Sequence, residues 1–189
     1  AAICATQLLF RPAYPVDETR YLAVAWAMYS DGHWLVPHLN GAIYSEKPPL
    51  LFWLIAIIWH VLGPTDLAPR LIQPCAAFLI LLCMRSMGRL LAPGSETRTN
   101  HGAWILLGMF GWQLAAPMVM FDVLLALFVM TAILGLIQAA CGRWIGWVTY
   151  ALGAAAAMLT KGPVGFVFIL PIALTARWWS FEHVRLPQW

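Results

Sequence analysis

Two stretches of this chain run for 20 residues each without a charged side chain, Gly102 to Phe121 and Val123 to Gly142. An apolar helix of about 20 residues is long enough to cross roughly 30 Å of hydrocarbon. The whole chain is 62% hydrophobic and 10% charged, and its mean hydropathy is +0.76. A soluble domain cannot bury that much apolar surface, so the sequence predicts an integral membrane protein.

The other apolar segments extend this pattern to a bundle. We expect an all-α fold, a polytopic bundle of transmembrane helices with interfacial helices in a long first outer loop. The expected elements are a partial first span at 1–10, the outer loop at 11–69, and spans at 70–91, 102–121, 123–141, 144–160 and 163–177. Because residues 1–10 are too few to cross a bilayer, we expect them to be the outer end of a first helix whose start is missing, and the chain to be a fragment of a larger protein.

The segment from Pro49 to Gly63 decides the orientation of the loops. A helix of its length is about 22 Å long, which is short for a crossing. If it lies in the outer interface instead, the arginine-rich loops fall on the cytoplasmic side, as the positive-inside rule requires. The arginines concerned are Arg85, Arg89, Arg98, Arg143, Arg177 and Arg185. We therefore expect an interfacial helix at 49–63, anchored by Trp53 and Trp59.

The same orientation brings charged side chains from distant parts of the chain to the outer side. They are Asp17, Glu18, Arg20, Glu46, Lys47, Asp122 and Lys161. Ionisable groups at the edge of a membrane are energetically costly, so their convergence indicates a functional site. Taken one at a time, each also has a simpler structural explanation.

The acidic pair in the outer loop has two interpretations. Asp17 precedes a helical apolar pattern, so it suits an N-cap, and Glu18 suits the first turn of that helix. Alternatively, two carboxylates at a helix start that face a cavity can act as a general base or as cation ligands. Arg20 projects from the same turn, where its guanidinium can bind a phosphate.

The remaining charged positions also leave two interpretations open. The proline after Lys47 holds this residue in extended geometry. The segment is either a charged turn before the apolar helix, or part of a site in which Lys47 neutralises an anion and Glu46 binds a cation. Asp122 either caps the helix that follows or lines a site. Lys161 either snorkels to the membrane surface or is held at a fixed point of the site by the Gly-Pro that follows it.

Several classes of site lack their sequence signatures. The five histidines show no HExxH spacing, and the four cysteines lie in apolar segments without metal-binding spacing. Neither GxxxxGK[ST] nor GxGxxG occurs, so we expect no nucleotide cofactor. The basic residues are dispersed along the chain, which argues against nucleic acid as a partner.

The run DETRYLAVAWAMYSDGHWLVPHLNGAIYSEKPPLLFWL at 17–54 resembles the first outer loop of polyprenyl-phosphate-dependent membrane glycosyltransferases of the GT-C fold. It is most similar to the bacterial aminoarabinose transferases that modify lipid A in lipopolysaccharide, which are related to the protein O-mannosyltransferases. Asp122 and LTKGP at 159–163 follow in the order that these enzymes have. The resemblance covers nearly the whole chain, but only the N-terminal part of such an enzyme.

The resemblance implies roles for the acidic residues. Asp17 would be the catalytic carboxylate, and Glu18, its neighbour in the acidic pair, is a candidate catalytic residue beside it. Asp122 would be the second acidic residue of the cavity, and Tyr21 would line it. One departure concerns the segment from Met118 to Asp122, which carries a single carboxylate where some relatives have a paired acidic motif.

The resemblance also implies the substrates. Arg20, Lys47 and Lys161 would hold the phosphate of a polyprenyl-phosphate-linked sugar donor, and Glu46 would help to bind a divalent metal cation with a partner beyond this chain. The acceptor would be a lipid such as lipid A, or a protein. The site would face the periplasm from the bacterial inner membrane, in a multi-pass protein embedded in the lipid bilayer.

Two functions of other classes compete with this one. A transporter or channel would use the charged residues to line a permeation path, but transport sites lie preferentially near the membrane midplane. A structural membrane subunit explains each charge singly as a cap or an anchor. It does not explain why the charges share one side.

Overall fold

The computed structural model describes residues 6–7, 10 and 16–179, without the side chains of Arg98 and Arg177. The predicted first span at 1–10 lies largely outside the described residues, and Arg185 lies wholly outside them. In the described part, the regular structure is helical apart from one two-stranded hairpin, so the all-α fold class is confirmed. In chain order the elements are α2 (Asp17–Asp31), β1 (His38–Leu39), β2 (Ala42–Ile43), α3 (Leu50–Leu62), α4 (Leu67–Arg70), α5 (Ile72–Leu91), α6 (Glu96–Gly108), α7 (Phe110–Ala115), α8 (Phe121–Ala140), α9 (Ile145–Lys161), α10 (Val164–Leu174) and α11 (Ala176–Trp179).

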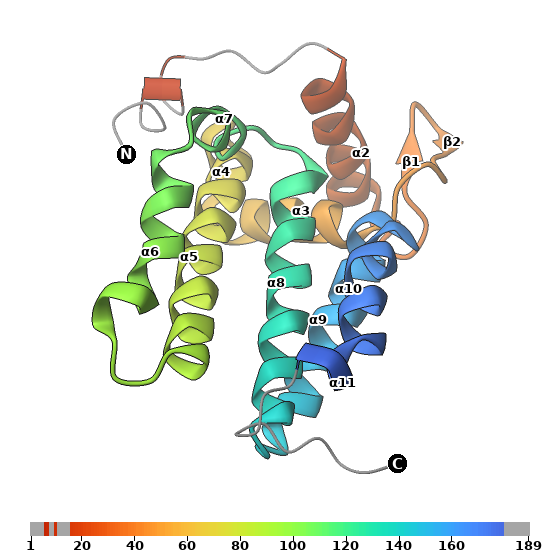
Figure 1. The fold of residues 1–189 in the computed structure, drawn as a ribbon. Helices are drawn as coiled ribbons and strands as arrows, with labels where there is room; N and C mark the ends of the chain where they lie inside the picture. The colour runs from red at the N-terminus through yellow and green to blue at the C-terminus, as the bar shows by residue number, and fades with distance from the viewer. Residues whose placement is uncertain (1–5, 8–9, 11–15, 180–189) are drawn as a thin grey trace.

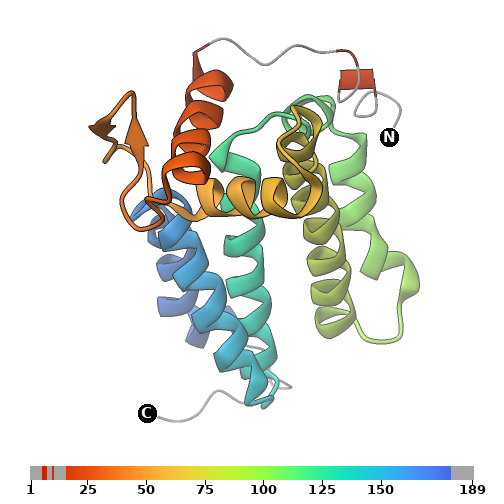
Figure 2. The ribbon, with the colours of Figure 1, turned by 180° about the vertical axis from the view of Figure 1, so that it is seen from behind.

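The longer helices run along one common direction, and the chain direction alternates from α5 to α6 and from α8 through α9 to α10 (Figures 1 and 2). Helix α3 lies across them near the end at which α5 and α8 begin, and α2 stands at that same end. An apolar helix laid across the end of a bundle has the placement expected of a helix in a membrane interface.

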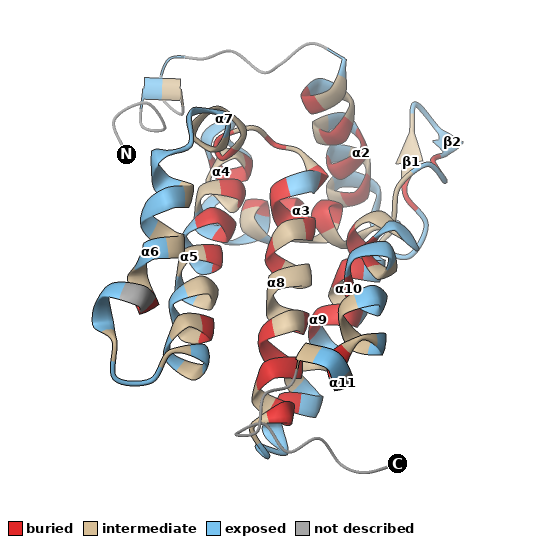
Figure 3. Ribbon diagram, viewed as in Figure 1, coloured by how far each residue is buried: buried red, intermediate tan, exposed pale blue. Residues whose placement is uncertain are grey.

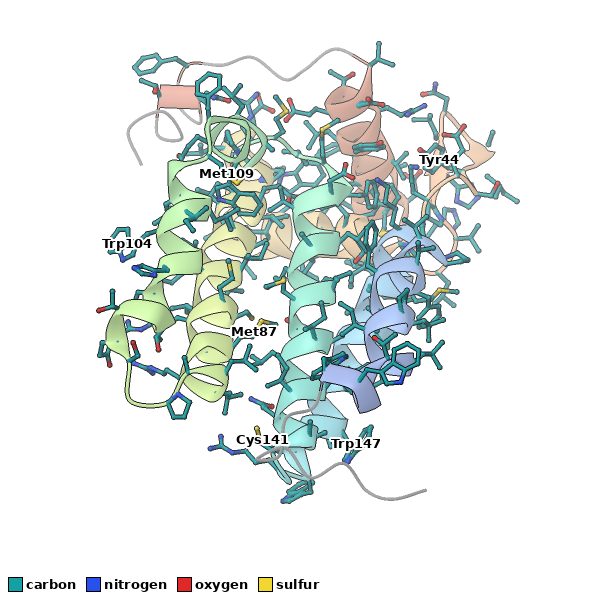
Figure 4. All side chains as sticks on the ribbon, in the orientation of Figure 1. Tyr44, Met87, Trp104, Met109, Cys141 and Trp147 are labelled. Carbon is teal, nitrogen blue, oxygen red and sulfur yellow. The ribbon has the colours of Figure 1, made fainter. Side chains whose placement is uncertain are left out.

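Hydropathy and surface composition agree with a membrane environment. Within the described residues, Leu67–Leu91 and Phe121–Ala140 are long and apolar enough to cross a bilayer. Large apolar side chains also point away from the bundle, among them Trp104 on α6, which is 68% exposed (Figure 4). Lipid tails can cover such a surface, whereas water cannot do so without a large free-energy cost.

The largest buried cluster fixes the end of the bundle where α2, α3 and α8 meet (Figure 3). Phe121, the first residue of α8, packs edge-on against Tyr21 of α2, with ring centroids 4.9 Å apart. Its ring also lies 5.6 Å from that of Phe52 in α3, again edge-on. Buried aromatic pairs of this geometry stabilise beyond their area alone, so the three rings hold the first turns of α2 and α8 together.

A tight hairpin precedes α3 and was not predicted from the sequence. Asn40 and Gly41 connect its strands with positive φ angles of 52° and 79°, the combination that a two-residue hairpin turn requires. The backbone N–H of Tyr44 then donates to the carbonyl oxygen of Pro37 across 2.8 Å. The hairpin therefore returns the chain toward α2 just before Glu46.

The segment predicted as one span at 102–121 is not one continuous helix. Helix α6 begins in the polar stretch at Glu96 and ends at Gly108, and Met109 is extended, with φ −73° and ψ 117°. Gly108 favours a break at this point, because glycine weakens a helix interior. The Gln113 side chain donates a hydrogen bond of 2.8 Å to the Leu107 carbonyl oxygen, which the break leaves without a helical partner. After α7, Pro117 opposes a further helical turn, and the chain stays non-helical until Phe121.

Helices α8 and α9 approach each other so closely that their contact needs glycine. A Cβ atom on Gly146 would lie 2.6 Å from the carbonyl oxygen of Gly135, and one on Gly153 would lie 2.5 Å from the backbone nitrogen of Ala132. Small residues at helix contacts are typical of membrane bundles, where close backbone packing replaces the hydrophobic effect. This contact fixes the relative positions of the start of α8 and the end of α9.

Candidate active site

The first group of charged residues surrounds Arg20 in the first turns of α2. One guanidinium nitrogen donates to Oδ1 of Asp17 across 2.9 Å, and another lies 3.5 Å from Oε2 of Glu46. The Tyr44 hydroxyl donates to the same Glu46 oxygen across 3.3 Å. Because the side chains of Asp17 and Glu46 are 42% and 62% exposed, this Arg20 group remains open to water and to a ligand.

The surroundings keep Arg20 charged and Tyr44 neutral. Burial raises the pKa of the Tyr44 hydroxyl to about 12, although Arg20 opposes that shift. Hydrogen bonding to Tyr21, followed by electrostatic interaction with Tyr44 and Glu46, raises the pKa of Arg20 above its ordinary value. Near neutral pH the group therefore presents a fixed cation between two carboxylates.

The second group is an ion pair between two helices. Nζ of Lys161, the last residue of α9, donates to Oδ1 of Asp122 in the first turn of α8 across 2.6 Å. Gly162 follows with a φ of +66°, which ends α9 and lets α10 begin at once. The pair borders a cavity of about 320 Å³ whose other lining side chains are apolar and come from α8 and α10. The cavity therefore combines a charged rim with an apolar wall.

Two interactions connect these groups at one end of the bundle. The backbone N–H of Val119 donates to Oε1 of Glu18 across 2.6 Å, and Tyr21 packs on Phe121. The first turns of α2 and α8 therefore touch, and the end of α9 joins them through the Lys161–Asp122 ion pair. The structure arranges the predicted residues as two neighbouring groups instead of one continuous cluster.

Not every predicted residue is placed where a ligand can reach it. Glu18 is 1% exposed and Tyr21 is 6% exposed, so both face the core. Lys47 is half-buried, and among the described residues its side chain has no ion-pair or hydrogen-bond partner.

Asp17 does not act as an N-cap, since Val16 occupies that position and the carboxylate bonds to Arg20. Asp122 likewise lies inside the first turn of α8, whose N-cap is Met120.

The residues expected to hold a divalent cation do not form a ligand set by themselves. Across the described residues, no group of three or more His, Cys, Asp or Glu side chains converges on one point. Glu46 is instead engaged by Arg20 and Tyr44. A metal there needs ligands from residues outside this set, so the Glu46 cation site stays a prediction.

Sequence reasoning missed two polar residues near the site. Tyr44 lies two positions before Glu46, just after an Asn-Gly dipeptide that is a strong hairpin signal. Gln73 is a lone amide in an apolar span, and its Nε2 donates to the Met120 carbonyl oxygen across 2.6 Å. A polar side chain inside a membrane span is a signal in its own right.

No family model matches the chain, but individual proteins do. It is 29% identical over 171 residues to the undecaprenyl phosphate-alpha-4-amino-4-deoxy-L-arabinose arabinosyl transferase of Pseudomonas aeruginosa (strain LESB58), covering 87% of this chain and 31% of that protein. The corresponding transferase 2 of Proteus mirabilis (strain HI4320) is 27% identical over 178 residues, covering 89% and 31%. The chain thus spans about a third of the length of these relatives.

Two solved structures share the fold. The chain matches ArnT from Cupriavidus metallidurans in the apo state with a TM-score of 0.80 and 22% identity, covering 94% of this chain and 35% of that one. The same protein bound to undecaprenyl phosphate matches with a TM-score of 0.77, covering 98% and 36%. These matches confirm the resemblance read from residues 17–54 and the membrane-protein fold class.

Proposed function

We propose that this chain forms part of a membrane glycosyltransferase that moves a 4-amino-4-deoxy-L-arabinose unit from undecaprenyl phosphate to a lipid acceptor such as lipid A. The observation that carries the proposal is the pair of charged groups at one end of the bundle, Arg20 between Asp17 and Glu46, and Lys161 on Asp122. The names of the relatives supply the sugar and the carrier. The activity is that of a complete enzyme. The relatives are about three times as long as this chain.

The cations provide the main catalytic contribution. In the reaction, the acceptor oxygen attacks the anomeric carbon, the bond from that carbon to the phosphate oxygen breaks, and negative charge grows on the departing phosphate. One preorganised donor at such a position is worth roughly 2.7–4 kcal/mol. Lys47 has no protein partner among the described residues, and the three N–H bonds of Lys161 allow it to bind a phosphate while keeping Asp122. Arg20 is the third donor.

The acceptor decides what Asp17 does. If the acceptor is a hydroxyl, the half-exposed Asp17 carboxylate removes its proton as the new bond forms. If the acceptor is a lipid phosphate, it is already anionic, and Asp17 orients it or balances the nearby positive charge. In both cases Arg20 holds the Asp17 carboxylate in position.

The cavity beside Lys161 suits the carrier lipid. Its volume of about 320 Å³ and its apolar side chains, among them Leu125, Val129 and Phe168, match the first units of a polyprenyl chain. The charged rim matches the phosphate to which that chain is attached. A divalent cation on Glu46 is a further proposal, and no step above depends on it.

The proposal predicts that Lys47→Ala lowers sugar transfer by roughly 10²- to 10³-fold, because one cation that stabilises the departing phosphate is lost. Transfer is measured in membranes that carry the complete enzyme, with labelled aminoarabinose on undecaprenyl phosphate and lipid A as acceptor. Arg89→Ala is the matched control, since Arg89 is an exposed cation in the last turn of α5, far from both groups. A transporter would instead move a substrate across sealed vesicles without forming glycosylated lipid.

We also propose that the protein is a multi-pass protein of the bacterial inner membrane, with the charged end facing the periplasm. Ser45 and Thr97 are exposed and flank α3 and α5 on opposite sides of one expected crossing. In a cysteine-free background, Ser45→Cys should react with a membrane-impermeant maleimide in intact cells, and Thr97→Cys only after the membrane is opened. Labelling of both from outside would contradict this orientation.

A further inference from the structure

We propose that Glu18 and Gln73 form a buried clamp on the backbone of Val119 and Met120, and that this clamp positions Asp122 for catalysis. Glu18 is then a positioning residue, although the DE pair in the sequence suggested that it shares the catalytic role of Asp17. The inference rests on the proposed function for its activity readout. Its structural readout does not depend on that function.

The clamp acts on a stretch of chain that lacks helical hydrogen bonds of its own. Between α7 and α8, Val119 directs its N–H to Oε1 of Glu18 across 2.6 Å. Met120, the next residue, accepts a hydrogen bond of 2.6 Å from Nε2 of Gln73. One contact comes from α2 and the other from α5, so two separate helices hold two consecutive residues. Asp122 follows two positions later.

Burial makes these bonds specific. Glu18, Val119 and Gln73 are each at most 1% exposed, so water cannot replace a missing partner. An unpaired polar group at such a depth is costly, which disfavours any other position of the Val119–Met120 segment. The ring of Phe121, 2% exposed, is held against Tyr21 and Phe52 just beyond the clamp.

The same burial argues against a catalytic role for Glu18. A catalytic group must contact the substrate, and the Glu18 side chain points into the core, whereas the neighbouring Asp17 side chain is 42% exposed. The two adjacent carboxylates of α2 therefore divide their tasks. Asp17 faces the Arg20 group, and Glu18 sets the distance from that group to Asp122 and Lys161. Displacements of about 1 Å in a catalytic arrangement can cost about 100-fold in rate.

Glutamine at position 18 is the decisive variant. Glu18→Gln keeps a carbonyl oxygen that can accept the Val119 N–H but has no carboxylate, while Glu18→Ala removes both. In the complete enzyme, we expect Glu18→Gln to retain activity within about tenfold of wild type, with an unchanged pH profile of kcat. Glu18→Ala should lower kcat by about 100-fold with little change in the KM for donor, as Gln73→Leu should also do.

The outcomes separate the possibilities. If Glu18→Gln is as inactive as Glu18→Ala while still folded, the carboxylate itself is needed and the clamp is overturned. Unchanged activity in Glu18→Ala also overturns it. Because Gln is nearly isosteric with Glu, the Glu18→Gln result decides the question even if the alanine variant does not fold. Glu96→Ala serves as the control, since the Glu96 side chain is 78% exposed and distant from the site.

Hydrogen exchange provides the readout that does not require transfer. The Val119 amide should be protected in wild type and in Glu18→Gln, and it should exchange faster in Glu18→Ala than in Glu96→Ala. If the wild-type enzyme transfers no sugar but shows this pattern, the proposed function fails and the clamp stands. If transfer is normal and the Val119 amide exchanges at the same rate in all variants, the clamp fails and the function stands.

Discussion

Replacing Asp17 with asparagine is expected to lower the rate of sugar transfer to a hydroxyl acceptor by roughly 10²- to 10⁴-fold, the range typical of a lost general base. The substitution keeps the shape of the side chain and an oxygen that can still accept the 2.9 Å hydrogen bond from Arg20. It removes the negative charge and the basicity. The expected loss is therefore chemical, and the fold should be unaffected because the Asp17 side chain is 42% exposed.

The measurement is kcat for transfer from labelled aminoarabinosyl undecaprenyl phosphate, compared with thermal unfolding of the same preparations. Asp31→Asn is the matched control, because Asp31 is an exposed carboxylate at the opposite end of the same helix. A larger loss with a hydroxyl acceptor than with a phosphate acceptor would identify Asp17 as the base. Asp17→Asn activity above half of wild type would remove Asp17 from the catalytic role.

The fold class was predictable because hydropathy is local in the sequence. The apolar run that became α8 and the short apolar segment that became α3 both follow from length and composition. The break at Met109 was not predictable in the same way. An uncharged run indicates where a span can lie, but a single extended residue, supported by the Gln113 side chain, interrupts it without changing the hydropathy.

The site was predictable only in part. Counting loops placed the charged residues on one side, but it could not tell which carboxylate meets which cation. Glu46 pairs with Arg20, and Lys161 pairs with Asp122 although 38 residues lie between them in the chain. Pairings of this kind depend on how helices pack, which no local pattern contains. The N-cap interpretation of Asp17, one of the two that the sequence left open, was wrong for a related reason, since its carboxylate bonds to Arg20.

Replacing Gly146 with leucine is expected to abolish the native contact between α8 and α9. Even the first added carbon would meet the backbone nitrogen of Ala139 and would lie 2.6 Å from the carbonyl oxygen of Gly135. Both obstacles are main-chain atoms of a helix, which cannot rotate away as a side chain can. Overpacking a core commonly costs about 1–3 kcal/mol, and separating two helices should exceed that range. Against a typical total stability of about 5–15 kcal/mol, we expect little folded protein.

The yield of monodisperse protein in detergent and its thermal unfolding midpoint measure this effect. Gly108→Ala is the control, because a Cβ there meets no described atom within 4 Å, and its unfolding midpoint should stay close to wild type. Gly153→Ala, with its new carbon 2.5 Å from the Ala132 nitrogen, should also destabilise the protein. Normal folding of Gly146→Leu would show that α8 and α9 are less tightly packed.

The contact between α8 and α9 also matters for the site, because α9 carries Lys161 about 22 Å beyond Gly146 and α8 carries Asp122 at its start. A helix pair forced apart at the glycines cannot keep a 2.6 Å ion pair at its far end, so stability and transfer should be lost together.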